Sequence, residues 1–178
     1  MKGLANEVPI FIHAYDPAAE DETHRMVERL ASRLRADGVT LATVDLFDLI
    51  LEHLEQERRL QRIIDAETSM GKPRLLALLN NLSDAKSRLI PWLLPHISGD
   101  QVRLTLLTGV GRVYPFLRTH TILEAVQPVM TQHPIVMFFP GEYVHDNNGS
   151  QLILFGSQPN PKLYRPYYRA INLDHYHL

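Results

Sequence analysis

The sequence predicts an α/β fold with a mainly parallel central sheet flanked by helices. Short apolar, β-rich runs occur at residues 8–15, 39–47, 102–108 and 134–139. Such runs are typical of strands that are buried on both faces. Segments with helical spacing of apolar residues separate them, and this alternation is typical of a parallel sheet covered by helices.

The connecting segments supply the expected helices. Apolar residues recur at helical spacing from Met26 to Leu34, and Gly38 follows as a stop signal. From Asp48 a second apolar stripe continues to Ile64 and predicts one long helix, with "ERRLQR" on its polar face. We expect a helical insert around residues 70–98, divided near Gly71, Asn81 and Pro91, and a further helix over residues 116–126.

The C-terminal part predicts an antiparallel edge. The run "PIVMFF" is expected to end at Pro140-Gly141, and "HDNNGS" has the composition of a hairpin turn. The runs "LILF" and "YYRAINL" predict two more strands. The architecture expected is therefore Rossmann-like or P-loop-like, without a Walker motif.

Composition limits the classes of protein that fit. The 178 residues suit a single domain, 1–178, and the formal net charge of -2 disfavours nucleic acid as the main ligand. Cysteine is absent, which excludes disulfides and thiolate metal sites. No run approaches the roughly 18 apolar residues of a membrane span, and the N-terminus does not resemble a signal peptide. We expect a cytoplasmic protein with no membrane contact.

The turn Thr108-Gly109-Val110-Gly111-Arg112 follows a strand, as a phosphate-binding loop does. A Walker loop would also need a lysine and a hydroxyl residue, and the Rossmann pattern would need a third glycine where Tyr114 stands. The structural interpretation is that two glycines allow a sharp turn and close packing of the next helix. The sequence favours this second interpretation.

Polar and aromatic residues follow the predicted strands. Because ligands bind beyond the carboxyl ends of parallel strands, one shared edge is expected there. It would include Tyr15, Asp16, Asp45, Thr108, Gly109, Gly141, Glu142 and Tyr143. On the next helix, Tyr114 and Arg118, like Phe116 and His120, would share a face at a spacing of four. Taken singly, Asp16 is expected to cap a helix, and Asp45 or Glu142 to close a turn.

The sequence gives little support for other kinds of functional site. The histidines are scattered without a metal-binding motif, no GxSxG elbow occurs, and we expect no metal and no cofactor. Tyr168 and Arg169 lie in a tyrosine- and arginine-rich segment that suits either a protein interface or an edge strand.

Four segments together resemble one known family. They are "VPIFIHAYDP", "LTGVGRVYPFLRTHTILEAVQ", "PIVMFFPGEY" and "LILFG…YYRAINL", in this order from about Val8 to Leu173. They resemble the BrxB family, components of BREX bacteriophage-defence systems. The motif positions are Gly109, Gly111, Tyr114, Pro115, Phe116, Arg118, His120, Pro140, Gly141, Glu142, Tyr143, Tyr168 and Arg169.

The resemblance implies an accessory subunit of a multi-protein defence complex that also holds a methyltransferase, ATPases and an alkaline-phosphatase-superfamily subunit. It carries over no active-site residue, so we expect no enzyme. The main hypothesis is a protein–protein adaptor that docks a larger subunit, either the phosphatase-superfamily one or an ATPase, with the phosphatase-superfamily subunit favoured. The alternative is a nucleotide-binding or signalling subunit that uses Gly109–Arg112 without hydrolysis, and direct nucleic-acid binding is the weakest option.

The residues expected to bind a partner or ligand come from the strand ends, the glycine turn and the motif segments. They are Tyr15, Asp16, Thr108, Gly109, Gly111, Arg112, Tyr114, Phe116, Arg118, His120, Glu142, Tyr143, Tyr168 and Arg169.

Overall fold

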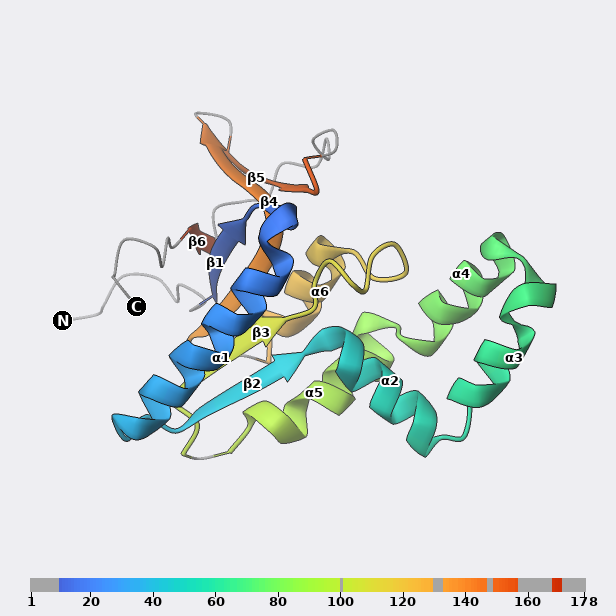
Figure 1. Cartoon of the computed structure of the whole chain (residues 1–178), viewed down its shortest axis with the longest axis horizontal. Helices are drawn as coiled ribbons and strands as arrows, with labels where there is room; N and C mark the ends of the chain where they lie inside the picture. Colours follow the sequence, from blue (N-terminus) through green and yellow to red (C-terminus); the bar gives the residue numbers. More distant parts are fainter. Residues whose placement is uncertain (1–9, 100, 130–132, 147–148, 157–167, 171–178) are drawn as a thin grey trace.

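A computed structural model describes residues 10–99, 101–129, 133–146, 149–156 and 168–170 (Figure 1). Its strands are β1 (Ile10–Tyr15), β2 (Leu41–Asp45), β3 (Leu104–Thr108), β4 (Ile135–Asp146), β5 (Gly149–Leu154) and β6 (Tyr168–Ala170). The α-helices are α1 (Glu20–Ala36), α2 (Leu46–Gln56), α3 (Leu60–Met70), α4 (Lys72–Leu82), α5 (Ile90–Ile97) and α6 (Thr119–Val126). The 3₁₀ turn η1 (Pro17–Ala19) precedes α1, and the π-helical turn η2 (Ala85–Leu89) precedes α5.

The predicted α/β class is confirmed. The sheet has the order β2-β3-β4-β1-β6, and all four of these strand pairs are parallel. Side chains alternate between its two faces: Ile10 and Ile12 join the main core, whereas Phe11 packs on the opposite side. The main core includes buried residues of α2, α5 and α6, and among the described helices α1 alone covers the other face, through Val27 and its neighbours.

The second strand ends earlier than predicted. It was expected to run to Phe47 with a helix from Asp48, but β2 stops at Asp45 and α2 begins at Leu46. The reason is a helix cap: the Asp45 carboxylate accepts hydrogen bonds from the backbone N–H groups of Phe47 (2.9 Å) and Asp48 (3.1 Å).

The expected long helix is two helices. The chain breaks between α2 and α3 at residues 57–59, where Arg58 adopts a left-handed conformation with φ 57°. "ERRLQR" therefore spans this break, and its predicted place on one helix face is wrong. Glu57 holds the corner through ion pairs with Arg59 (3.0 Å) and with Arg88 (2.9 Å) of η2.

The helical insert is confirmed, but its divisions differ. Gly71, with φ 75°, separates α3 from α4 as predicted. The next division lies at Ser83-Asp84, past Asn81, because Asp84 caps η2 by accepting a hydrogen bond from the Ser87 N–H (2.9 Å). Pro91 does not interrupt a helix: it sits in the first turn of α5, where a proline needs no N–H. In Figure 1, α3 and α4 project to one side of the sheet.

The fourth strand runs further than predicted. It does not end at Pro140-Gly141 but continues to Asp146 and pairs antiparallel with β5, which confirms the hairpin. Gly141 allows β4 to continue and to pair with β5, because it has φ 151° and a Cβ there would collide with the carbonyl oxygen of Ile153. The last strand, β6, is parallel to β1, so the antiparallel part of the sheet is the β4–β5 hairpin. None of the helices in the described part of the chain combines the length and apolar character that crossing a bilayer requires.

One buried histidine should make stability depend on pH. His133 is 6% exposed, its Nε2 lies 2.9 Å from Thr105 Oγ1, and burial lowers its pKa. The unfolded chain therefore binds this proton at higher pH than the folded chain. The stability that the neutral His133 contributes should be fully present above pH 6.5, the ordinary pKa of histidine. The free energy of unfolding should fall as the pH drops below that value.

Urea unfolding at pH 7.5 and 5.5 tests this for wild type and His133→Gln. The variant should lose less stability between the two pH values than wild type does. An identical loss in both proteins would assign the pH dependence to other groups.

Candidate functional site

Residues from three strand ends meet at a pocket at the carboxyl edge of the sheet. Its volume is about 230 Å³. It is lined by Tyr15, Glu20, Asp21, Thr23, His24, Asp45, Thr108, Arg112 and Phe138. The chain leaves β1 toward the α1 face, whereas β2 leads into α2 on the main-core face. β3 and β4 lie between these two strands in the sheet. The pocket lies beyond the carboxyl ends of parallel strands, which is the usual place of ligand sites in α/β sheets.

The Asp45 carboxylate makes several polar contacts at this pocket. Its Oδ1 caps α2, and its Oδ2 accepts a hydrogen bond from Thr108 Oγ1 (3.2 Å) and lies 3.3 Å from Arg112 Nη1. The Asp45 side chain is 13% exposed. This carboxylate joins the ends of β2 and β3 to the glycine turn, so its role is structural, as the turn-closing interpretation predicted.

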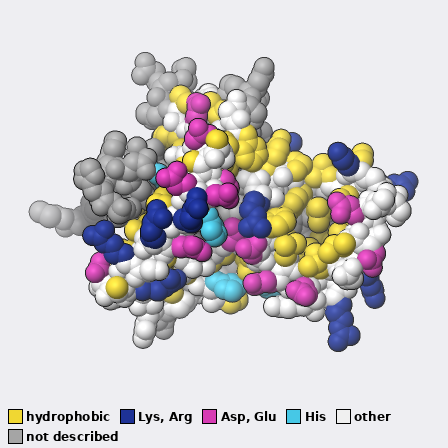
Figure 2. Space-filling model, viewed as in Figure 1, with side chains coloured by type: hydrophobic (Ala, Val, Ile, Leu, Met, Phe, Trp, Pro, Cys, Tyr) yellow, Lys and Arg dark blue, Asp and Glu magenta, His cyan; other side chains and the backbone are white. Residues whose placement is uncertain are grey.

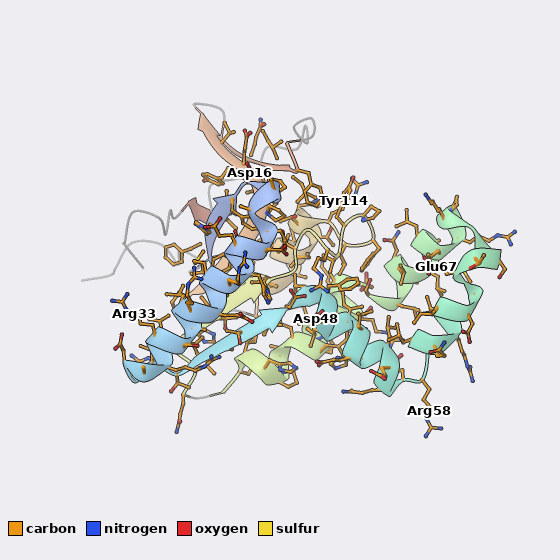
Figure 3. The ribbon with its side chains drawn as sticks, viewed as in Figure 1. Asp16, Arg33, Asp48, Arg58, Glu67 and Tyr114 are labelled. Atoms are coloured by element: carbon orange, nitrogen blue, oxygen red, sulfur yellow. The ribbon has the colours of Figure 1, made fainter. Side chains whose placement is uncertain are left out.

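Arg112 is neutralised by its neighbours. Besides Asp45, its guanidinium contacts Asp48 Oδ1 (Nη2, 3.0 Å) and lies 4.5 Å from the centre of the Phe47 ring. Figure 3 shows Asp48 on the side of α2 that faces this loop. Two carboxylates therefore already pair with Arg112, the guanidinium of this turn that a bound phosphate would need.

The first glycine of the turn is pressed against the same carboxylate. Gly109 has φ 75°, and a Cβ there would lie 2.7 Å from Asp45 Cγ. A phosphate cradled by this turn would approach a carboxylate at close range, which is electrostatically unfavourable. The geometry thus favours the architectural role of the turn and weighs against the nucleotide alternative.

Tyr15 closes the opposite side of the pocket. Its hydroxyl donates a hydrogen bond to Glu20 Oε2 (2.5 Å). Burial, and then the Glu20 carboxylate, raise the pKa of Tyr15 far above its ordinary value of 10, so the hydroxyl stays protonated. Asp16 does not line the pocket: its carboxylate caps η1 by accepting a hydrogen bond from the Ala18 N–H (2.9 Å), the capping role predicted from sequence.

The predicted helix over residues 116–126 begins only at Thr119, so two predicted residue pairs do not share a helix face. Residues 110–117 form an irregular turn that contains a cis peptide bond between Tyr114 and Pro115. Phe116 packs against the main core, whereas Tyr114 is 46% exposed. Arg118 is exposed at the start of α6, and His120 is half-buried on that helix.

Tyr114 forms an aromatic pair with Phe155. Phe155 is 45% exposed, and the two rings meet edge to face with centroids 6.1 Å apart. Figure 3 shows Tyr114 on the outer side of its loop. Gly111 allows the close approach, since a Cβ there would lie 2.7 Å from Pro140 Cγ and 3.1 Å from the Phe155 ring. The glycine turn and the β4–β5 hairpin thus build one exposed apolar feature.

The remaining predicted residues lie apart from these two features. Glu142 is exposed on β4, and Tyr143 packs against the main core. Tyr168 and Arg169 belong to β6, in register with Ile10 and Phe11, and their side chains lie outside the described residues. The single edge predicted from sequence is therefore divided into the pocket, the aromatic pair and separate strands.

Sequence reasoning missed several site residues. Glu20, Asp21 and His24 were not predicted to line a site, and Phe155 was expected only as part of a strand. Their positions in the sequence did not indicate a site, because only the folded chain brings these residues to the strand ends. In the described part of the chain, no group of three or more His, Cys, Asp or Glu residues could hold a metal ion.

Comparison with known proteins identifies the family. The family model described as BREX protein BrxB matches residues 42–173. The chain belongs to the BrxB family. Its BrxB relatives include a Bacillus cereus (strain H3081.97) protein, 32% identical over 170 residues that cover 93% of this chain and 85% of that protein. An Escherichia coli O9:H4 (strain HS) protein is 28% identical over 171 residues, covering 96% and 80%. Both carry the name BREX protein BrxB, and no solved structure gives a significant match.

The glycine turn provides a test of the close packing. Gly109→Ala should destabilise this BrxB protein by about 3 kcal/mol, the sum of backbone strain and a clash with Asp45. Gly38→Ala is the matched control, because Gly38 also has positive φ (81°) but nothing lies within 4 Å of a Cβ there. The control should lose only about 1 kcal/mol.

Thermal and urea unfolding of both variants measure the difference. In an Asp45→Ala background, the additional loss caused by Gly109→Ala should fall to the Gly38 value, because the clash is removed. Equal losses for Gly109→Ala and Gly38→Ala in the wild-type background would contradict the packing argument.

Proposed function

We propose that this BrxB protein is a non-catalytic adaptor of a BREX phage-defence complex, which docks a larger subunit in the cytoplasm. The partner we propose is the alkaline-phosphatase-superfamily subunit. Family membership supports the defence context, and both named relatives are BREX proteins. The observation that carries the adaptor role is the exposed Tyr114–Phe155 pair.

The aromatic pair has the properties of a docking site. Protein interfaces draw most of their binding energy from a few aromatic and arginine anchors. Tyr114 and Phe155 leave nearly half of their surfaces in solvent, although both are large apolar side chains. Gly111 and Pro140 hold their two segments in close contact, so the pair is pre-organised and little conformational entropy would be lost on binding.

The pocket supports a non-catalytic role. A catalytic base or acid needs a group free to exchange a proton with a substrate. Asp45 is occupied by helix capping, Thr108 and Arg112, and the Tyr15 hydroxyl is bonded to Glu20. These groups hold the strand ends together, which favours a rigid binding scaffold over an active site.

Truncation of the pair should break the complex. Tyr114→Ala and Phe155→Ala should each weaken binding of the phosphatase-superfamily subunit at least ~30-fold, about 2 kcal/mol, because an anchor is lost. The measurement is co-expression followed by size-exclusion chromatography with light scattering, and then calorimetric titration. Ile64→Ala is the matched control, since Ile64 is 51% exposed on α3 and lies outside the pair.

The variants must keep the wild-type circular dichroism spectrum and melting temperature within ~2 °C, since both side chains are half-exposed. If wild type binds the subunit and both variants bind equally well, the pair is not the docking site. If wild type forms no complex, the proposed partner is wrong.

A further inference from the structure

One border of the sheet is open. In the described part of the chain β2 pairs only with β3, so its other side forms the edge of the sheet (Figure 1). Native edges are usually protected by lysine, proline or a bulge, and the sequence LATVD of β2 contains neither residue. Thr43, at its centre, is exposed.

The backbone of Thr43 faces away from the sheet. The Thr105 N–H donates to the Pro134 carbonyl on the β4 side of β3. Directions alternate along a strand, so Leu106 turns its backbone groups toward β2. Its register partner Thr43 therefore presents its own N–H and C=O to the open border.

A groove runs beside this border, between α1 and β2. Its volume is about 530 Å³. The floor is apolar, with Val27 and Ala31 from α1, Val44 from β2 and Leu106 from β3. Glu28, Ser32, Arg35 and Thr43 also line the groove, and Figure 2 shows charged side chains gathered along α1 on this face.

The groove continues into the pocket at the strand ends, because His24, Asp45 and Thr108 line both cavities. That end carries excess negative charge: Glu20, Asp21 and Asp45 face the single guanidinium of Arg112, which Asp48 also contacts. No ion pair of the described residues includes Asp21, which is exposed. A further cation would therefore be attracted there.

The open edge favours an extended chain as the occupant. Five residues of β2 span about 16 Å at ~3.3 Å per residue, which is enough for a short added strand. The edge supplies the backbone hydrogen bonds that such a strand needs, and the groove beside it receives alternate side chains.

We infer that this groove binds an extended segment of another subunit of the same defence system. The segment adds a strand beside β2, buries apolar side chains against Val27 and Leu106, and places a lysine or arginine in the acidic pocket. This second interaction rests on membership of the BrxB family and not on the aromatic pair. It holds whether or not Tyr114 and Phe155 dock the phosphatase-superfamily subunit.

The test uses overlapping 15-residue peptides that cover all other subunits of the system, titrated by fluorescence anisotropy. At least one peptide should bind, and replacing its lysine or arginine with alanine should weaken binding about 10-fold or more. Thr43→Pro should have a similar effect because it removes a backbone donor, whereas Thr43→Val, which keeps the N–H, should not. Asp21→Asn should weaken binding, and Glu22→Gln, its neighbour outside the pocket, should not.

Hydrogen exchange on the wild-type protein gives a readout that needs no variant. The bound peptide should protect the amides of β2 that face the open border, those of Leu41, Thr43 and Asp45, since directions alternate along the strand. The inference is overturned if no peptide binds, or if bound peptides leave these amides unprotected. It is also overturned if Thr43→Pro and Asp21→Asn, both folded, bind the peptide like wild type. Loss of the phosphatase-superfamily complex in Tyr114→Ala with retained peptide binding would separate the two surfaces.

Discussion

The Asp45 carboxylate is the interaction on which the carboxyl edge of the sheet depends. It ends β2, caps α2, accepts the Thr108 hydroxyl and pairs with Arg112, all within 3.3 Å. A partly buried carboxylate loses some of its hydration, and hydrogen bonds and a counter-charge compensate that loss here. Gly109 is required because no side chain fits between this carboxylate and the turn. The shape of the loop therefore depends on one partly buried carboxylate.

The aromatic pair is a consequence of the same loop. Once the turn is fixed at Asp45, Gly111 lets it pack against Pro140, and β4 continues past Gly141 and pairs there with β5. Phe155, at the end of β5, then meets Tyr114. The glycines of two motifs some 30 residues apart thus serve close backbone packing, which is the property that a rigid docking surface needs.

Topology decides where the charges lie. A net charge of -2 suggests no strong electrostatic preference, yet the connection from β1 to β2 places the acidic first turn of α1 beside the end of β2. The same connection crosses two strands, and no strand of the described residues pairs with the outer side of β2. The acidic pocket, the groove and the open border therefore have one origin, the order of strands in the sheet.

The sequence by itself determined the fold class, most of the helices and strands, and the capping role of Asp16, because apolar periodicity and capping act over a few neighbouring residues. It predicted a turn-closing role for Asp45, and the structure shows that this carboxylate caps α2. The sequence could not place the break at Arg58, the continuation of β4 past Gly141 or the late start of α6. These depend on contacts with distant segments, such as the pairing of Glu57 with Arg88 and of Gly141 with Leu154. The candidate site was predicted in part for the same reason: strand ends are visible in sequence, but only the tertiary structure brings Phe155 to Tyr114 and Asp21 to Asp45.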